Sequence, residues 1–372
     1  MKIQDGLYLS LTAFAALAVP AAFAQGSSAQ TGPSQAASAP ATTAAPITLP
    51  VTVVNDHGDP VKNLSASTLT LVDNGHPQKI DSFSLAQPAP ASIGILVQTS
   101  PDLRFELGDA RLAGVRFVDH TIPGSDNKFF VIQFSNEVDL LENPTSDVNK
   151  LHDAINHLGA PQSEDQNGGD QPSSDRHQAA FGANLYDAIY LACTEVLKQQ
   201  PGRHILIVLT DGVDRGSKEG YNEAVQAAQS TNTMVFSIYY RGEVQRSTAG
   251  EPGTSRRSTG PGFPGGVGLP GGGGGYPRGG DRRRNEQPQQ SPETGEKLLE
   301  QLGNATGGYK VVGKHDKAED GFDKLAALLK NPYTLTWTPD SATAASPSHH
   351  ITLSTREKGV FPIVQANYTT HP

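Results

Sequence analysis

Four largely apolar runs, separated by segments with helical spacing, constrain most strongly how this chain can fold. The runs are ASIGILV at 91–97, FFVIQF at 129–134, ILIVL at 205–209 and MVFSIY at 234–239. The third has no polar residue and the first has only Ser92, a composition typical of parallel strands buried on both faces. The alternation of strands with helices predicts an α/β fold over residues 91–330, a doubly wound, mostly parallel sheet with helices on both faces.

The segments between these runs repeat apolar residues every three or four positions. Leu185, Ile189, Ala192 and Val196 are one such set, and they mark an amphipathic helix. The single cysteine, Cys193, lies within this pattern. We therefore expect a buried structural thiol and no nucleophile.

Both ends of the folded chain show the alternation of apolar and polar residues that is typical of half-buried strands. The first lies in residues 47–86 and the second in residues 333–370. Three strands with one exposed face are not stable alone, and their edges need partners. We therefore expect 333–370 to pack with 47–86 in a β-sandwich-like domain. In the second segment His349 and His350 begin a strand, so their side chains should point to opposite faces.

A Gly/Pro-rich insertion, residues 243–291, interrupts the α/β pattern. Glycine and proline fill 16 of the 21 positions from Gly260 to Gly280, a composition that cannot bury a core. Helical spacing resumes after it, so the insertion lies inside one domain and does not separate two. From Arg241 to Arg284 eight Arg residues stand against three acidic residues, and the rest of the chain is acidic within a net charge of −9. An acidic body argues against nucleic acid as the partner.

The N-terminus has the features of a secretory signal peptide. Residues 1–24 combine Lys2, an apolar Ala-rich run and a small-residue cleavage site before Gln25. Residues 25–46, rich in Ala, Ser, Thr, Pro and Gln, predict a disordered spacer. No later segment has membrane-spanning length. We expect an exported protein, periplasmic or extracellular, without a transmembrane segment after signal removal.

Polar loops follow two of the predicted parallel strands. These loops are QTSPD at 98–102 and TDGVD at 210–214. Ligands of open α/β sheets gather at the carboxyl ends of the strands. The two loops are therefore the first place to look for a binding site.

The order of three motifs resembles von Willebrand factor A domains. The motifs are ASIGILVQTSPDL, GANLYDAIYLA and HILIVLTDGVDRGS. Residues 47–370 look most similar to the von Willebrand factor A-related proteins of acidobacteria. Their opening β segment resembles VTVVNDHGDPVKNL, and their closing Tyr-x-Leu-x-aromatic strand matches Tyr333 to Trp337. The resemblance implies the fold and a protein partner, whose identity it does not specify.

The resemblance also implies a metal-ion-dependent adhesion site, from which this sequence departs. In that family an Asp-x-Ser-x-Ser loop, a Thr and an Asp hold one divalent cation, which binds an acidic residue of the partner. Here Ser100 matches the first Ser and Asp211 matches the last Asp. Gln98 replaces the first Asp, and Asp102 replaces the second Ser. Ala183 stands at the Thr position, with Asn184 beside it.

Two interpretations of these departures remain open. One is a degenerate site in which Ser100, Asp102 and Asp211 hold Mg²⁺ with low, millimolar affinity. The other is a site without metal, in which Asp211 only accepts backbone N–H bonds.

Three functions follow, of which the first is favoured. It is an exported protein-binding module that acts through the strand-end loops. The alternatives are a metal-assisted hydrolase that uses Asp102, Asp211 and Asp214, and a structural envelope protein without metal. The sequence contains no Gly-x-Ser-x-Gly or His-Glu-x-x-His motif. We therefore expect no catalytic residues and no enzymatic activity.

Overall fold

A computed structural model of the chain describes residues 45–86, 89–103, 105–123, 125–160, 183–240, 292–312 and 318–369. The expected signal peptide 1–24, nearly all of the spacer 25–46 and the insertion 243–291 lie outside these residues. The side chain of Asp102 lies outside them as well. In the described ranges, no helix combines the length and the apolar character needed to cross a membrane.

A six-stranded sheet forms the centre of the α/β part, in the order β10-β9-β8-β5-β6-β7. Its strands are β5 (Ala91–Gln98), β6 (Lys128–Phe134), β7 (Val138–Thr145), β8 (Arg203–Thr210), β9 (Thr233–Tyr239) and β10 (Lys310–Val312). All neighbours pair in parallel except β6 and β7, which are antiparallel. The predicted α/β class with a mostly parallel sheet is confirmed.

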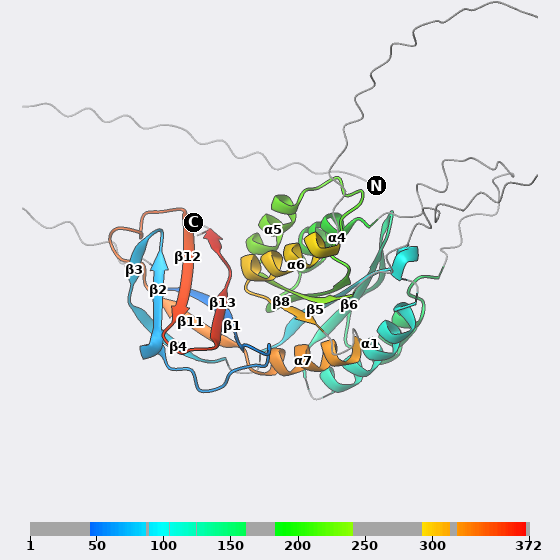
Figure 1. Cartoon of the computed structure of the whole chain (residues 1–372), viewed down its shortest axis with the longest axis horizontal. Helices are drawn as coiled ribbons and strands as arrows, with labels where there is room; N and C mark the ends of the chain where they lie inside the picture. Colours follow the sequence, from blue (N-terminus) through cyan, green and yellow to red (C-terminus); the bar gives the residue numbers. More distant parts are fainter. Residues whose placement is uncertain are drawn as a thin grey trace, which may run out of the picture. The chain divides into compact units, whose positions relative to one another are not determined.

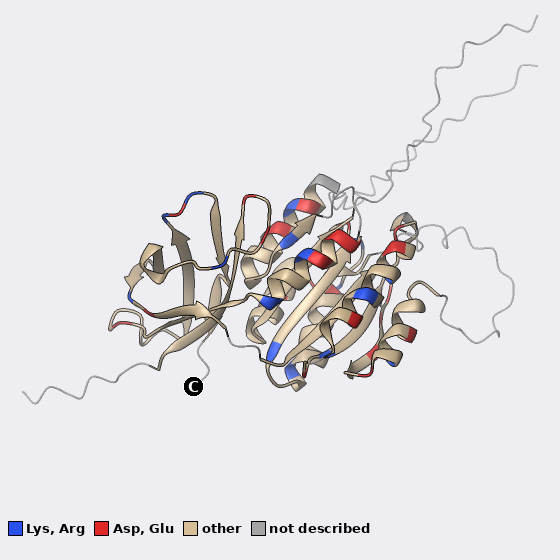
Figure 2. Ribbon diagram, turned by 90° about the horizontal axis from the view of Figure 1, so that it is seen from below, with Lys and Arg blue, Asp and Glu red and all other residues tan. Residues whose placement is uncertain are grey.

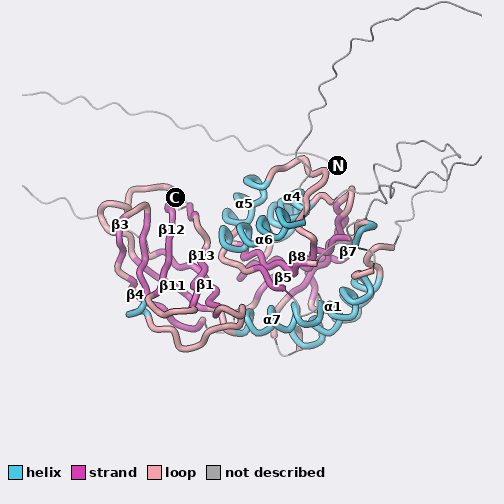
Figure 3. The backbone as a smooth tube through the Cα atoms, in the orientation of Figure 1, coloured by secondary structure: helices cyan, strands magenta, loops and turns pink. Residues whose placement is uncertain are grey.

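Helices cover both faces of this sheet (Figures 1 and 3). On one face α1 (Leu107–Thr121), α2 (Val148–Asn156) and α7 (Ala318–Lys330) contribute to one buried cluster. On the other face α4 (Leu185–Leu191), α5 (Tyr221–Ser230) and α6 (Pro292–Thr306) contribute to a second. Strands β5 and β9 carry no charged residue, and charged side chains lie mainly on helices and loops (Figure 2). Burial on both faces explains why these strands are mostly apolar.

The predicted helix through Val196 changes its winding before it ends. Helix α4 continues as a π turn at Ala192–Val196 and a 3₁₀ turn at Leu197–Gln199. The π turn contains Cys193, which is buried as predicted.

The strands from the two chain ends form two further sheets. One has the order β13-β1-β11-β4, and the other has the order β14-β12-β2-β3. These strands are β1 (Ile47–Asn55), β2 (Leu69–Asp73), β3 (His76–Gln78), β4 (Ile80–Leu85), β11 (Tyr333–Trp337), β12 (Ser348–Thr355), β13 (Val360–Val364) and β14 (Asn367–Thr369). Strand β1 pairs with both β11 and β13, and β2 pairs with β12. Residues of both sheets meet in one buried cluster that contains Leu49, Leu71 and Trp337.

The end of the segment 333–370 contains two strands that belong to different sheets. Strand β13 pairs with β1, and β14 pairs with β12, so the chain passes from one sheet to the other at Gln365 and Ala366. Here the Ala366 N–H donates to the Ala305 carbonyl at 3.0 Å, near the end of α6. The switch depends on a partner far away in sequence, so local alternation could not predict it.

Candidate functional site

Gln98, the last residue of β5, joins the carboxyl ends of the two middle strands of the central sheet. Its side chain is 1% exposed. Its Oε1 accepts hydrogen bonds from Thr210 Oγ1 at 2.5 Å and from the Asp211 backbone N–H at 3.2 Å. Because a backbone N–H can only donate, this contact fixes the orientation of the amide. The N–H₂ side of Gln98 therefore faces the loop that follows β5.

Ser100 lies in that loop and is fully buried. Its Oγ accepts a hydrogen bond of 2.7 Å from Gln98 Nε2. Its carbonyl accepts from the Leu103 N–H, at the short 3₁₀ helix Pro101–Leu103. The structure thus brings Ser100 together with the end of β8 through Gln98. The backbone of Asp102 lies in the same 3₁₀ helix.

Asp211 directly follows β8, and its side chain is 2% exposed. Its Oδ1 accepts from the Val213 N–H at 3.0 Å, and its Oδ2 forms an ion pair of 3.2 Å with Arg215. The Arg215 side chain is 32% exposed, so the pair runs from the interior to the surface. The carboxylate that was predicted as a metal ligand is thus already next to a permanent positive charge.

Gly212 allows the chain to turn between Asp211 and Val213. It has a φ of +72°, in the left-handed region that favours glycine. A Cβ at this position would lie 2.4 Å from the Gly295 carbonyl oxygen in α6. Close backbone contact therefore holds this loop against α6.

The rest of the loop after β8 is attached to the beginning of α4. Asp214 accepts from Ser217 Oγ at 2.6 Å and from the Tyr186 N–H at 3.2 Å. Asp187, in the first turn of α4, accepts from the backbone N–H groups of Lys218 and Glu219. These side chains fix the loop from both sides, as carboxylates commonly do with unpaired N–H groups at turns.

Ala183 and Asn184 precede α4 at the position where the resemblance places a Thr ligand. The Ala183 carbonyl accepts from the Arg215 N–H at 3.0 Å. The Asn184 side-chain amide donates to the Asn136 carbonyl at 2.5 Å, in the turn between β6 and β7. Asn184 therefore links α4 to that turn, in a role that the sequence did not suggest.

The described donor set does not fit a divalent cation. Mg²⁺ needs oxygen ligands that are free to face it. Gln98 directs an N–H toward Ser100, and Arg215 neutralises Asp211. Among the described residues, no three His, Cys, Asp or Glu side chains form a group that could hold a metal. Sequence reasoning treated Gln98 as a lost ligand and overlooked Arg215, although Arg215 stands only four positions after Asp211.

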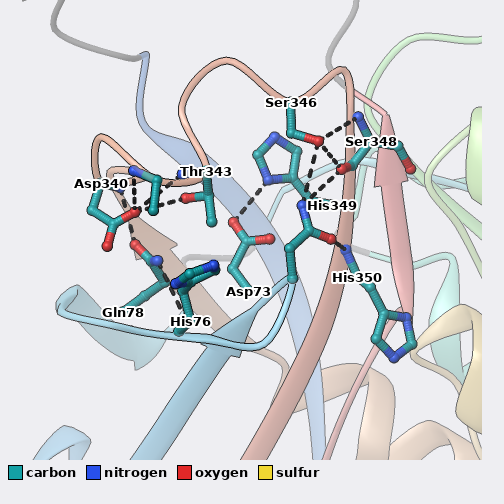
Figure 4. A network of polar contacts seen from close by, with 11 residues as sticks. Asp73, His76, Gln78, Asp340, Thr343, Ser346, Ser348, His349 and His350 are labelled. Carbon is teal, nitrogen blue, oxygen red and sulfur yellow. Dashed lines mark hydrogen bonds and ion pairs between the residues drawn. The ribbon is translucent and has the colours of Figure 1, made fainter.

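A second polar cluster lies in the sheets formed by the chain ends (Figure 4). The Asp340 carboxylate accepts from the Ala342 and Thr343 N–H groups, and its own N–H donates to Gln78 Oε1 at 3.1 Å. A side-chain hydrogen bond with Gln78 and the hydrogen bonds from Ala342 and Thr343 lower the pKa of Asp340, against an opposing effect of desolvation. Nearby, His349 is buried and His350 is exposed, as predicted for strand neighbours. The cluster organises a turn and offers no convergent ligand set.

The sequence matches no family model and no curated protein. Among solved structures, the chain is similar to BatB, a conserved hypothetical protein from Bacteroides thetaiotaomicron. The identity is 16% over 65% of this chain and 100% of that chain, with a TM-score of 0.36. It is similar to an aerotolerance-related membrane protein from Bacteroides fragilis at 16% identity, over 64% and 98% of the two chains, with a TM-score of 0.36. It is also similar to the vWF domain of the type V pili tip protein Mfa5 from Porphyromonas gingivalis. That identity is 17% over 35% and 40%, with a TM-score of 0.28.

Proposed function

We propose that this chain is an exported protein-binding module of the von Willebrand factor A-related type, which engages its partner through the loops at the carboxyl edge of the central sheet. Open α/β sheets bind their ligands at this edge. The observation that carries the proposal is the buried link from Ser100 through Gln98 to Thr210 and Asp211. It holds the loops after β5 and β8 in one arrangement before a partner arrives, which lowers the entropy lost on binding.

The proposed site uses the charge of Arg215 where the related adhesion sites use a metal. Arg215 lies beside the buried Asp211 and is partly exposed at the edge of the sheet. The partly exposed guanidinium can donate a hydrogen bond to a carboxylate of the partner. We therefore propose a partner that offers an acidic side chain and binds without divalent metal.

The two strand-end aspartates support a binding role over a hydrolytic one. A general base needs a carboxylate that can reach a substrate proton. Asp211 is engaged by Arg215 and the Val213 N–H, and Asp214 is engaged by Ser217. Both side chains hold the loop, and a nucleophile with a histidine base is not assembled beside them in the described residues. The proposal therefore includes the absence of enzymatic activity.

The sheets of the chain ends complete the proposed architecture. We propose that they form a β-sandwich, supported by the buried cluster to which both sheets contribute. The position of the signal peptide before the spacer supports export. In this proposal the α/β part is joined to the sandwich, and the strand-end loops of the α/β part form the binding site.

The experiment is capture of a partner by the immobilised mature chain, residues 25–372, from an envelope extract of the source organism. Each capture is run in parallel with EDTA and with added Mg²⁺. The matched variants are Arg215→Gln at the site and Arg356→Gln at an exposed position in the chain-end sheets. Thermal melting first confirms that both variants fold.

We expect the wild type and Arg356→Gln to capture the same protein and Arg215→Gln to lose it. Equal capture by Arg215→Gln, or capture that requires Mg²⁺, would refute the role of Arg215. The absence of any saturable partner would refute the binding function itself.

A further inference from the structure

A cavity of about 490 Å³ lies at the amino-terminal edge of the central sheet, away from the strand-end loops. Residues at the beginning of β5 and β8 line it together with the last turns of α1 and α7. Its volume falls in the range of small-molecule sites, roughly 300–1,000 Å³. The cavity therefore has the size to hold a ligand.

One side of the cavity is apolar. Ile93 and Ile205 are directly paired neighbours on β5 and β8, and both line the cavity from the sheet. Leu329 and Ala326 line it from α7. These walls favour the hydrocarbon part of a ligand, because filling the cavity removes apolar surface from water.

The other side of the cavity carries an arginine without a counter-ion. Arg203, the first residue of β8, lines the cavity and is partly buried. Within the ranges that the structure describes, it forms no ion pair, and its backbone N–H donates to the Pro90 carbonyl. Burial lowers the pKa of Arg203, and no carboxylate offsets that effect. Charged side chains in such positions usually have a partner.

The other charged residues of the described lining include more basic than acidic side chains. Lys330 and His120 line it from the last turns of α7 and α1, where cations complement the negative helix ends. Asp126 is the one acidic residue of the lining. Two permanent cations thus face one carboxylate, so the described lining has a positive excess.

A second polar group points to the same ligand chemistry. Thr121, the last residue of α1, lines the cavity, and its Oγ1 is buried without a hydrogen-bond partner among the described residues. A buried hydroxyl without an acceptor is rare in folded proteins. A rotation of the Thr121 side chain toward the cavity would let a ligand oxygen accept from this hydroxyl as well as from the Arg203 guanidinium.

We infer that this cavity binds a small organic carboxylate with an apolar body, whose carboxylate pairs with Arg203 and accepts from Thr121. The apolar body lies against Ile93, Ile205 and Leu329. A carboxylate fits better than a phosphate, because one excess positive charge matches a monoanion and because apolar walls penalise a second unpaired charge. The inference is independent of the proposed function, since it involves neither the loops nor Arg215.

Calorimetric titration of the purified mature chain with octanoate tests the inference, with octylammonium as the probe of opposite charge. Thr121→Val removes the hydroxyl without breaking a hydrogen bond, so this variant should fold normally. Arg203→Met removes the guanidinium and keeps an apolar stem. Arg356→Met is the matched control at an exposed arginine.

We expect saturable binding of one octanoate by the wild type and by Arg356→Met, and none of octylammonium. Arg203→Met should weaken octanoate binding about tenfold or more, and Thr121→Val about threefold or more. No saturable octanoate binding by the wild type overturns the inference. So does equal binding of octylammonium, or octanoate affinity that is unchanged in both folded variants. If Arg203→Met fails to fold, the result for Thr121→Val decides.

Discussion

His349 and Asp73 form a completely buried pair between β12 and β2, in which His349 Nδ1 lies 2.7 Å from Asp73 Oδ2. Their side chains are 1% and 0% exposed (Figure 4). The other carboxylate oxygen of Asp73 has no hydrogen-bond partner in the described residues. His349 is therefore the group on which the burial of this carboxylate depends.

Replacing His349 with alanine should destabilise the protein strongly. The change leaves Asp73 buried without its partner, which typically costs about 3–5 kcal/mol of the free energy of unfolding. Urea denaturation measures the loss. The exposed neighbour His350 is the control, and His350→Ala should cost less than about 1 kcal/mol. Similar losses in the two variants would contradict this account of the pair.

The central sheet could be predicted because each of its buried strands shows its apolar character within one continuous segment of sequence. Strands β5 and β9 are buried on both faces, so most of their side chains are apolar or small, and the pattern is visible in one segment. Strand β3 was missed, because a three-residue strand that contains Pro77 has no recognisable period. The change of sheet at Gln365 was missed because its cause is the distant Ala305 carbonyl.

Gly212→Ala should destabilise the protein more than Gly75→Ala does. Both glycines have a positive φ, which costs an alanine roughly 1–2 kcal/mol. At Gly75 a Cβ meets nothing within 4 Å, whereas at Gly212 it would lie 2.4 Å from a backbone oxygen of α6. We expect a loss of about 1 kcal/mol for Gly75→Ala and at least about 3 kcal/mol for Gly212→Ala. Equal midpoints of urea unfolding would show that the loop after β8 moves away freely from α6.

The candidate site was predictable in position but not in its connections. The strand-end loops were found because polar residues after buried strands meet at one edge of the sheet, and the resemblance then singled out Ser100 and Asp211 within them. Their partners were not found. The Gln98 amide contacts residues more than a hundred positions away, and nothing in its own loop indicates this. Gln98 was therefore interpreted as a loss, although in the structure it replaces a ligand with a hydrogen-bonded bridge.

Titration with Mg²⁺ or Mn²⁺ should show millimolar affinity or none in the wild type. Any weak affinity for the metal ion should fall in Asp102→Asn, because Asp102 supplies a carboxylate where the adhesion-site motif has a Ser. The double change Gln98→Asp and Arg215→Gln should raise the affinity, because it replaces an N–H donor with a carboxylate and frees Asp211. Calorimetry measures all three proteins. Tight wild-type binding that is unaffected by Asp102→Asn would place the ion elsewhere.

Cys193 should make stability fall at alkaline pH. Burial raises the pKa of its thiol from 9.0 to about 12, although hydrogen bonds with Thr231 and Thr233 act in the opposite direction. Between these values the unfolded chain has lost the proton and the folded chain keeps it, so the unfolded state binds fewer protons. The contribution to stability is thus fully present below pH 9 and decreases as the pH rises toward 12, by up to about 1.4 kcal/mol per unit.

Urea denaturation of the wild type and of Cys193→Ala at pH 8, 9, 10 and 10.5 measures this dependence. All other titratable groups are the same in both proteins, so their contribution cancels in the difference. We expect the wild type to lose stability more steeply above pH 9, by about 1 kcal/mol per unit. A maleimide should label Cys193 at pH 8 only in urea, because the folded thiol is buried and protonated. Parallel stability curves, or rapid labelling of the folded protein, would show that the π turn opens and exposes this thiol to solvent.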